Sequence, residues 1–230
     1  MTGVLALVAV PVVRFVIPDP TSEIAAGAAR STIPMSEILR DPELARLNFG
    51  IFSLHGILMA MFVVLPIELN RYLAESDEWK MYLGVMLTSL VIMVPVMLLS
   101  ERRGARKTAF IGAVVVLAVA LSVLAFGSGQ FLASVIGLVM FFAAFNLLEA
   151  SLPSLVSRVG PPRAKGAAIG VYSTSQFIGT FAGATAGGCI AEYFSNTMVF
   201  AFCTFAALVW LGVAAGMRVP GEAVTPAGRS

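Results

Sequence analysis

Two titratable side chains lie inside long apolar stretches of this sequence. His55 is the only histidine among the 230 residues, and Glu149 lies in a different apolar stretch. Asn146 precedes Glu149 by one helical turn and would share its face. A charged or polar group is costly to bury within a membrane, so such residues are candidates for function. An imidazole and a carboxylate held together could load and release a proton.

Composition indicates which elements hold these residues. Hydrophobic residues make up 58% of the chain and charged residues 12%, about half the charged share of a soluble domain. The apolar residues gather in blocks that each reach or approach the roughly 20 residues a membrane-spanning helix needs. The blocks are 47–69, 79–99, 108–126, 131–157, 166–190 and 197–217. The sequence therefore predicts an all-α integral membrane protein with a six-helix transmembrane bundle.

Basic residues occupy alternate connections between these blocks. They precede the first block, separate the second from the third and the fourth from the fifth, and follow the sixth. They are Arg30, Arg40, Arg46, Arg102, Arg103, Arg106, Lys107, Arg158, Arg163, Lys165, Arg218 and Arg229. The positive-inside rule places these connections in the cytoplasm. We therefore expect 218–230 to be a cytoplasmic tail and 71–78 to face outward as a solvated loop.

The segment before the first block has two interpretations. Residues 3–17 are apolar, but they are short for a span and lack the basic start of a signal peptide. They could be a re-entrant or interfacial segment, or the inner end of a helix whose outer part is missing. We expect the second, with 1–17 as a short apolar helix, the remnant of a preceding transmembrane helix. Residues 18–46 would then be a cytoplasmic linker, with a short amphipathic turn at 36–40.

The connection between the second and third blocks carries a distinctive charge pattern. Its gating candidates are Glu101, Arg102, Gly104, Arg106 and Lys107. The glycine permits a tight turn, and the charges can pair with one another and with helix ends. This loop resembles the cytoplasmic signature of the major facilitator superfamily, although Ala105 stands where the fuller signature has a basic residue. The alternative is a loop that serves topology alone.

Three further stretches carry the same resemblance. They are RLNFGIFSLH at 46–55, FNLLEASLPSL at 145–155 and KGAAIGVYSTSQF at 165–177. Over residues 1–217 the chain resembles the carboxy-terminal half of the YajR-like, multidrug-efflux-type branch of the superfamily, from the end of its sixth helix to its twelfth. The resemblance implies a twelve-helix fold of two halves, a central cavity and alternating access. It also implies a missing amino-terminal half as a partner.

The resemblance further implies that the first and fourth helices of this half line the cavity. These helices hold His55 and Glu149. With a rise of about 1.5 Å per residue, each lies roughly 12 Å from the cytoplasmic end of its block. His55, Asn146 and Glu149 are therefore candidates for a proton and substrate pathway.

Simpler interpretations of both titratable residues stay open. Glu149 could pair with Arg102 or Arg106 as a latch that closes the cytoplasmic gate. His55 could be a packed histidine whose ring is hydrogen-bonded to a backbone carbonyl or a hydroxyl.

The fifth block is rich in small and polar residues. Gly179, Gly183 and Gly187 recur at every fourth position, a pattern that permits close contact between helices. Tyr172 and Gln176 are also four residues apart and share a face. They could contact a substrate or support the cavity wall.

These features together favour one class of function. We expect a secondary active transporter of a bacterial inner (plasma) membrane that exports small amphipathic compounds in exchange for protons. Its partners would be the small-molecule substrate, protons and the lipid bilayer, with no nucleic acid. No histidine cluster, acidic metal-binding pair or phosphate-binding loop is present, so we expect no enzyme activity, no cofactor and no metal. The alternative is a truncated, non-transporting remnant or a membrane interaction or regulatory protein.

Overall fold

The computed structural model describes residues 34–74 and 76–217. In these ranges all regular secondary structure is helical. The helices are α3 (Met35–Arg40), α4 (Pro42–Leu69), α5 (Glu78–Arg102), α6 (Arg106–Phe126), α7 (Phe131–Val159), α8 (Lys165–Tyr193) and α9 (Asn196–Ala215). The expected remnant helix 1–17, the first part of the linker and the tail 218–230 lie outside the described residues.

Most of the long helices are able to cross a bilayer. Among the described residues, α4, α5, α6, α7 and α9 are both long enough and apolar enough for a membrane span. The remaining long helix, α8, has 29 residues, and its polar run Ser173–Gln176 and many glycines lower its hydropathy. It packs alongside the spanning helices. The prediction of an all-α membrane bundle is confirmed.

The helix ends differ from the apolar blocks for a local reason. α4 begins at Pro42, inside the expected linker, because Asp41 caps it. The Asp41 carboxylate accepts hydrogen bonds from the backbone N–H groups of Glu43 and Leu44, each at 2.9 Å. Proline suits a first helical turn, where no N–H is needed. Hydropathy gives no sign of this polar first turn. A capping carboxylate followed by proline does indicate it.

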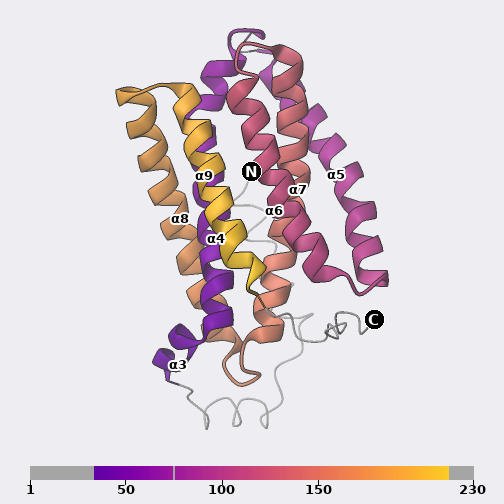
Figure 1. The fold of residues 1–230 in the computed structure, drawn as a ribbon, viewed down its shortest axis with the longest axis vertical. Coiled ribbons are helices and arrows are strands. Elements are labelled where there is room, and N and C mark those ends of the chain that lie inside the picture. Colours follow the sequence, from indigo (N-terminus) through magenta and orange to yellow (C-terminus); the bar gives the residue numbers. More distant parts are fainter. Residues whose placement is uncertain (1–33, 75, 218–230) are drawn as a thin grey trace, which may run out of the picture. The chain divides into compact units, whose positions relative to one another are not determined.

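α4 is the central element of the packing. It makes its most extensive contact with α8, and it also contacts α9 and α7. α6 packs against α7 and α9, whereas α5 packs mainly against α7. In Figure 1, α8 and α5 accordingly lie at opposite edges, with the other long helices between them. The connections α4–α5, α6–α7 and α8–α9 lie together at one end of the bundle (Figure 1).

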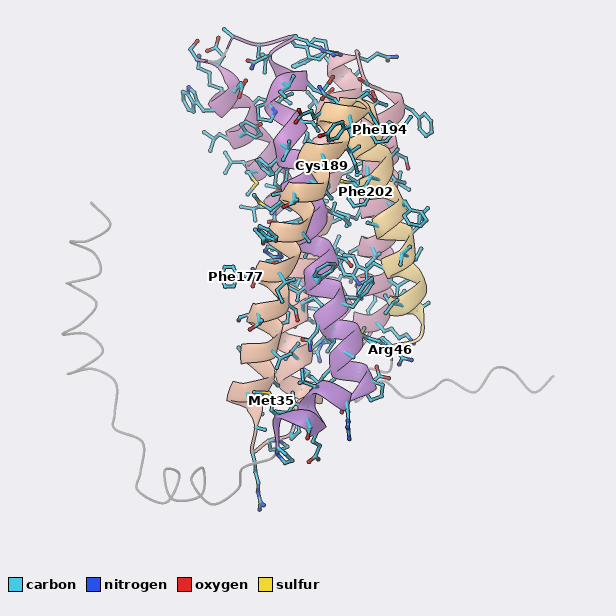
Figure 2. The ribbon with its side chains drawn as sticks, turned by 90° about the vertical axis from the view of Figure 1, so that its left-hand side faces the viewer. Met35, Arg46, Phe177, Cys189, Phe194 and Phe202 are labelled. Atoms are coloured by element: carbon cyan, nitrogen blue, oxygen red, sulfur yellow. The ribbon has the colours of Figure 1, made fainter. Side chains whose placement is uncertain are left out.

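The two edge helices present large apolar surfaces. Only 11% of the most apolar part of α5 is buried, and its buried residues are Val85 and Ser89. On α8, Gly179, Gly183 and Gly187 face α4 while Phe177 and Phe181 stay exposed. Figure 2 shows Phe177 pointing away from the bundle. Such apolar exposure is unfavourable in water, and it suits a protein whose surroundings are lipid or further helices.

Candidate proton and substrate site

His55 and Glu149 face each other across the α4–α7 contact. His55 Nδ1 lies 3.8 Å from Glu149 Oε2. The His55 side chain is 13% exposed and that of Glu149 37%, so Glu149 has the more accessible side chain, although its Oε2 atom is buried. Neither of these two atoms has a hydrogen-bond partner among the described residues. The structure thus brings the two titratable candidates together at a distance that a small approach would convert into a hydrogen bond.

The other ring nitrogen of His55 contacts α8. Gln176 Nε2 lies 2.8 Å from His55 Nε2. An amide nitrogen can only donate, so this geometry requires an accepting ring nitrogen, which a neutral His55 offers when its ring proton is on Nδ1. His55 therefore has a side-chain partner on a second helix, the Gln176 amide, in place of the backbone carbonyl or hydroxyl considered from the sequence.

Tyr172 lies one helical turn before Gln176 in α8. Its side chain is buried, and its hydroxyl has no hydrogen-bond partner within the part of the chain that the structure describes. The Glu149 carboxylate acts electrostatically on this phenol. His55, Glu149, Tyr172 and Gln176 therefore form one polar cluster, contributed by α4, α7 and α8.

Asn146 belongs to a neighbouring contact. Its Nδ2 donates to Ser89 Oγ of α5 at 3.1 Å, and Ser89 Oγ donates to the Met86 carbonyl at 2.8 Å. Ser89 is fully buried. Although Asn146 lies one turn from Glu149, its side chain ties α7 to α5. Sequence reasoning did not single out Ser89, because a serine in an apolar helix usually bonds its own backbone, as this hydroxyl also does.

A row of aromatic rings continues from this polar cluster toward α5. The His55 ring lies 5.8 Å from that of Phe145, which lies 6.5 Å from Phe142. Phe62 is 6.2 Å from Phe142 and 6.3 Å from Tyr82, between ring centroids in each case. Such edge and offset contacts are favourable between aromatic rings. The sequence signal was present: Phe62 follows His55 by two helical turns, and Phe145 lies directly before Asn146.

The basic loop has its own internal pairing. Gly104 has φ +64°, a left-handed conformation that glycine adopts without strain, and it turns the chain between α5 and α6. Arg106 Nη2 lies 3.7 Å from Glu101 Oε1 across this turn. Arg102 is exposed at the end of α5. In this structure Arg106 pairs within its loop, while Glu149 faces His55, so the alternative latch between Glu149 and Arg106 is not formed.

The glycines of α8 lie directly against the α4 backbone. A Cβ atom built on Gly179 would come within 2.2 Å of Phe52 O, and one on Gly183 within 2.0 Å of Gly56 O. On Gly187 it would come within 2.7 Å of Ala60 Cα. Only a residue without a side chain permits this approach. The contact fixes the register of α4 against α8, and with it the pairing of His55 with Gln176.

A second polar cluster was missed from the sequence. The buried Glu68, in the last turn of α4, accepts hydrogen bonds from Asn196 Nδ2 at 3.0 Å and Ser128 Oγ at 3.4 Å. Arg71 Nη1 lies 3.1 Å from its Oε2. Arg71 and Ser128 belong to the α4–α5 and α6–α7 connections, and Asn196 is the first residue of α9. From the sequence alone, a carboxylate so close to a helix end is expected to be solvent-exposed. Only the fold shows that three segments converge on it.

Comparison with known proteins agrees with the fold and the loop. The family model of the Major Facilitator Superfamily matches residues 78–230. The chain is 38% identical over 224 residues to the inner membrane transport protein YajR of Escherichia coli (strain K12), covering 96% of this chain and 49% of that protein. It is 28% identical over 182 residues to an uncharacterized transporter of Buchnera aphidicola subsp. Baizongia pistaciae (strain Bp), covering 76% of this chain and 45% of that protein.

The chain therefore spans about half the length of the curated relatives it matches. Both relatives are described as transporters, and the longer alignment extends over nearly the whole chain. The helical bundle, its apolar surface and the loop at 101–107 fit the same assignment. The chain is a multi-pass membrane protein and belongs to the Major Facilitator Superfamily.

Proposed function

We propose that this chain supplies the carboxy-terminal half of the translocation path of a proton-coupled exporter of small amphipathic compounds. The observation that carries the proposal is the facing pair His55 and Glu149, deep in two helices of the bundle. Intramembrane titratable groups are expensive, and they commonly mark ion or proton pathways. An amino-terminal half would complete the cavity, in keeping with the share of the relatives that the alignments cover.

The cluster supports proton exchange through the accessibility of Glu149. Its side chain is partly exposed and flanks the single histidine, and its buried Oε2 makes no hydrogen bond that would have to break before a proton is taken up. A protonated Glu149 carries no charge, whereas an ionised one attracts a positively charged or polar substrate group. Loss of the proton and binding of substrate would thus be coupled at one carboxylate.

The aromatic row supports the choice of substrate class. The partly exposed Phe145 lies beside His55, with Phe142 buried behind it, so a ligand that contacts Glu149 would also meet an aromatic ring. Such a surface binds the apolar part of a molecule whose polar part reaches the carboxylate. The basic loops support a cytoplasmic tail at 218–230. The similarity to an inner membrane transport protein supports a bacterial inner membrane location. Compounds would then move from the cytoplasm outward as protons move in.

A transport assay tests this proposal. Purified protein is reconstituted into liposomes with its amino-terminal half present, a pH gradient is imposed, and uptake of ethidium serves as an amphipathic probe. Glu149→Gln should reduce gradient-driven uptake to background, because the amide cannot exchange a proton. The matched control is Glu192→Gln, the same chemical change at an exposed position near the end of α8, which should retain uptake. Equal uptake by Glu149→Gln and wild-type protein would rule out Glu149 as the proton carrier.

A further inference from the structure

We infer that Gln176 is a positioning residue that holds the ring proton of His55 on Nδ1 and so directs it at Glu149. The inference rests on the proposed function, since it assigns Gln176 a role in the same proton step. It begins from the 2.8 Å contact between Gln176 Nε2 and His55 Nε2. The hydrogen bond made by one ring nitrogen determines which nitrogen carries the proton.

The carboxylate on the other side of the ring favours the same tautomer. Away from Gln176, His55 Nδ1 faces Glu149 Oε2 across 3.8 Å. A bare Nδ1 would place its lone pair against an ionised carboxylate 3.8 Å away, whereas an Nδ1–H group is attracted to it. The titratable groups near His55 are Glu149 from α7 and Tyr172 from α8. The Tyr172 phenol interacts with Glu149.

The helix contact beneath the cluster holds Gln176 at the right height. Gly56 directly follows His55, and its added Cβ would lie 3.3 Å from the Gly179 carbonyl, one turn beyond Gln176. Gly179 in turn lies against Phe52, one turn before Gly56. The two backbones therefore cannot slide past each other without a clash. The amide reaches Nε2 because this contact sets the level of α8 against α4.

Glutamine suits both protonation states of its neighbours. When Glu149 is ionised, the Gln176 amide N–H donates to Nε2 and Nδ1–H points at Oε2. When Glu149 carries a proton, its O–H can donate to Nδ1, the ring proton then sits on Nε2, and the Gln176 amide oxygen accepts it after the amide has turned over. One proton is added between the two states, and the ring is neutral in both.

The tautomer can be measured directly because the chain has a single histidine. With 15N-labelled histidine in lipid nanodiscs, every ring-nitrogen signal of the chain belongs to His55. At a pH where Glu149 is ionised, wild-type protein should show a protonated Nδ1 and an unprotonated Nε2. This is the reverse of free histidine in water, where the Nε2–H form dominates. A wild-type spectrum with the proton on Nε2 overturns the assignment.

Substitutions at Gln176 separate positioning from packing. Gln176→Glu keeps the size but offers only acceptor oxygens, so it should move a proton onto Nε2. Gln176→Leu removes the partner and should lose the pure Nδ1–H signal. Gln130→Leu, the same change at the exposed turn before α7, is the matched control and should keep the wild-type spectrum. If Gln176→Glu folds and leaves Nε2 unprotonated, Gln176 does not determine the tautomer.

The transport assay distinguishes this inference from the proposed function. If Gln176→Leu changes the tautomer and reduces ethidium uptake in the pH gradient, the positioning role of Gln176 and the proposed function are both supported. If it changes the tautomer while uptake stays at the wild-type level, Gln176 still positions the ring, but His55 does not take part in proton coupling. An unchanged tautomer with reduced uptake overturns the positioning role alone.

Discussion

The contact at Gly183 predicts how the bundle responds to one added methyl group. In Gly183→Ala, the new Cβ would lie 2.0 Å from Gly56 O and 2.5 Å from Gly56 Cα. Both atoms belong to the α4 backbone, so no side chain can rotate to make room. Ordinary contact begins near 3.4 Å, so α8 must move away from α4 by more than about 1 Å.

The size of the effect follows from two opposed terms. Forcing a methyl group into a packed contact costs about 1–3 kcal/mol, because the helices separate and their other contacts loosen. Alanine recovers up to about 1 kcal/mol through its higher helix propensity. At Gly188 of the same helix nothing lies within 4 Å of an added Cβ, so only the second term applies there. Gly183→Ala should therefore be less stable than Gly188→Ala by about 1–3 kcal/mol.

A buried thiol gives a direct readout of unfolding. Cys203 of α9 is fully buried, and its Sγ lies 3.8 Å from the Ile57 carbonyl of α4. In a Cys189→Ser background, which removes the exposed thiol, a thiol-reactive dye in detergent reports when Cys203 becomes accessible on heating. Gly183→Ala should release Cys203 at a lower temperature than Gly188→Ala. Equal melting temperatures would refute the claim that α4 and α8 are in backbone contact at Gly183.

Two further substitutions test the ends of α4. Glu68→Ala should lower the free energy of unfolding by about 2 kcal/mol, because it removes hydrogen bonds to a charged group and leaves the Asn196 amide without this acceptor. The same heating assay measures it, with Glu192→Ala as the exposed control; equal stability of the two variants would contradict the network. Asp41→Ala should cost about 1 kcal/mol by removing the cap. Hydrogen exchange at the amide of Leu44 should then accelerate. Unchanged exchange would show that the Asp41 cap does not stabilise the start of α4.

The elements were predictable because membranes impose a strong local constraint. A spanning helix needs about 20 apolar residues, so each helix can be predicted from its own residues without knowledge of its neighbours. The ends were less well predicted, since α4 starts at Pro42 through a polar capping turn that hydropathy ignores. α8 was predicted as an apolar block despite its polar run, and the four-residue spacing of its glycines predicted close helix contact.

The site was predictable only in part, because side-chain pairs across helices depend on register. Equal depth suggested that His55 and Glu149 lie at one level, and they are 3.8 Å apart. Gln176 was a candidate by its face on α8, but nothing in the sequence pairs it with His55. Asn146 shares a helix with Glu149 yet bonds to Ser89, since helical spacing does not say which neighbour a side chain meets. These contacts arise from how α4, α5, α7 and α8 are packed.

The Glu68 cluster also bears on how the helices can tilt. It ties the last turn of α4 to the turn before α7 and to the start of α9. A tie at one end acts as a pivot, so the displacement of a tilting helix grows with distance from it. His55 lies roughly 20 Å from Glu68 along α4, at about 1.5 Å per residue. A rotation of about 5° about that pivot would move His55 by about 2 Å, enough to open or close its gap to Glu149.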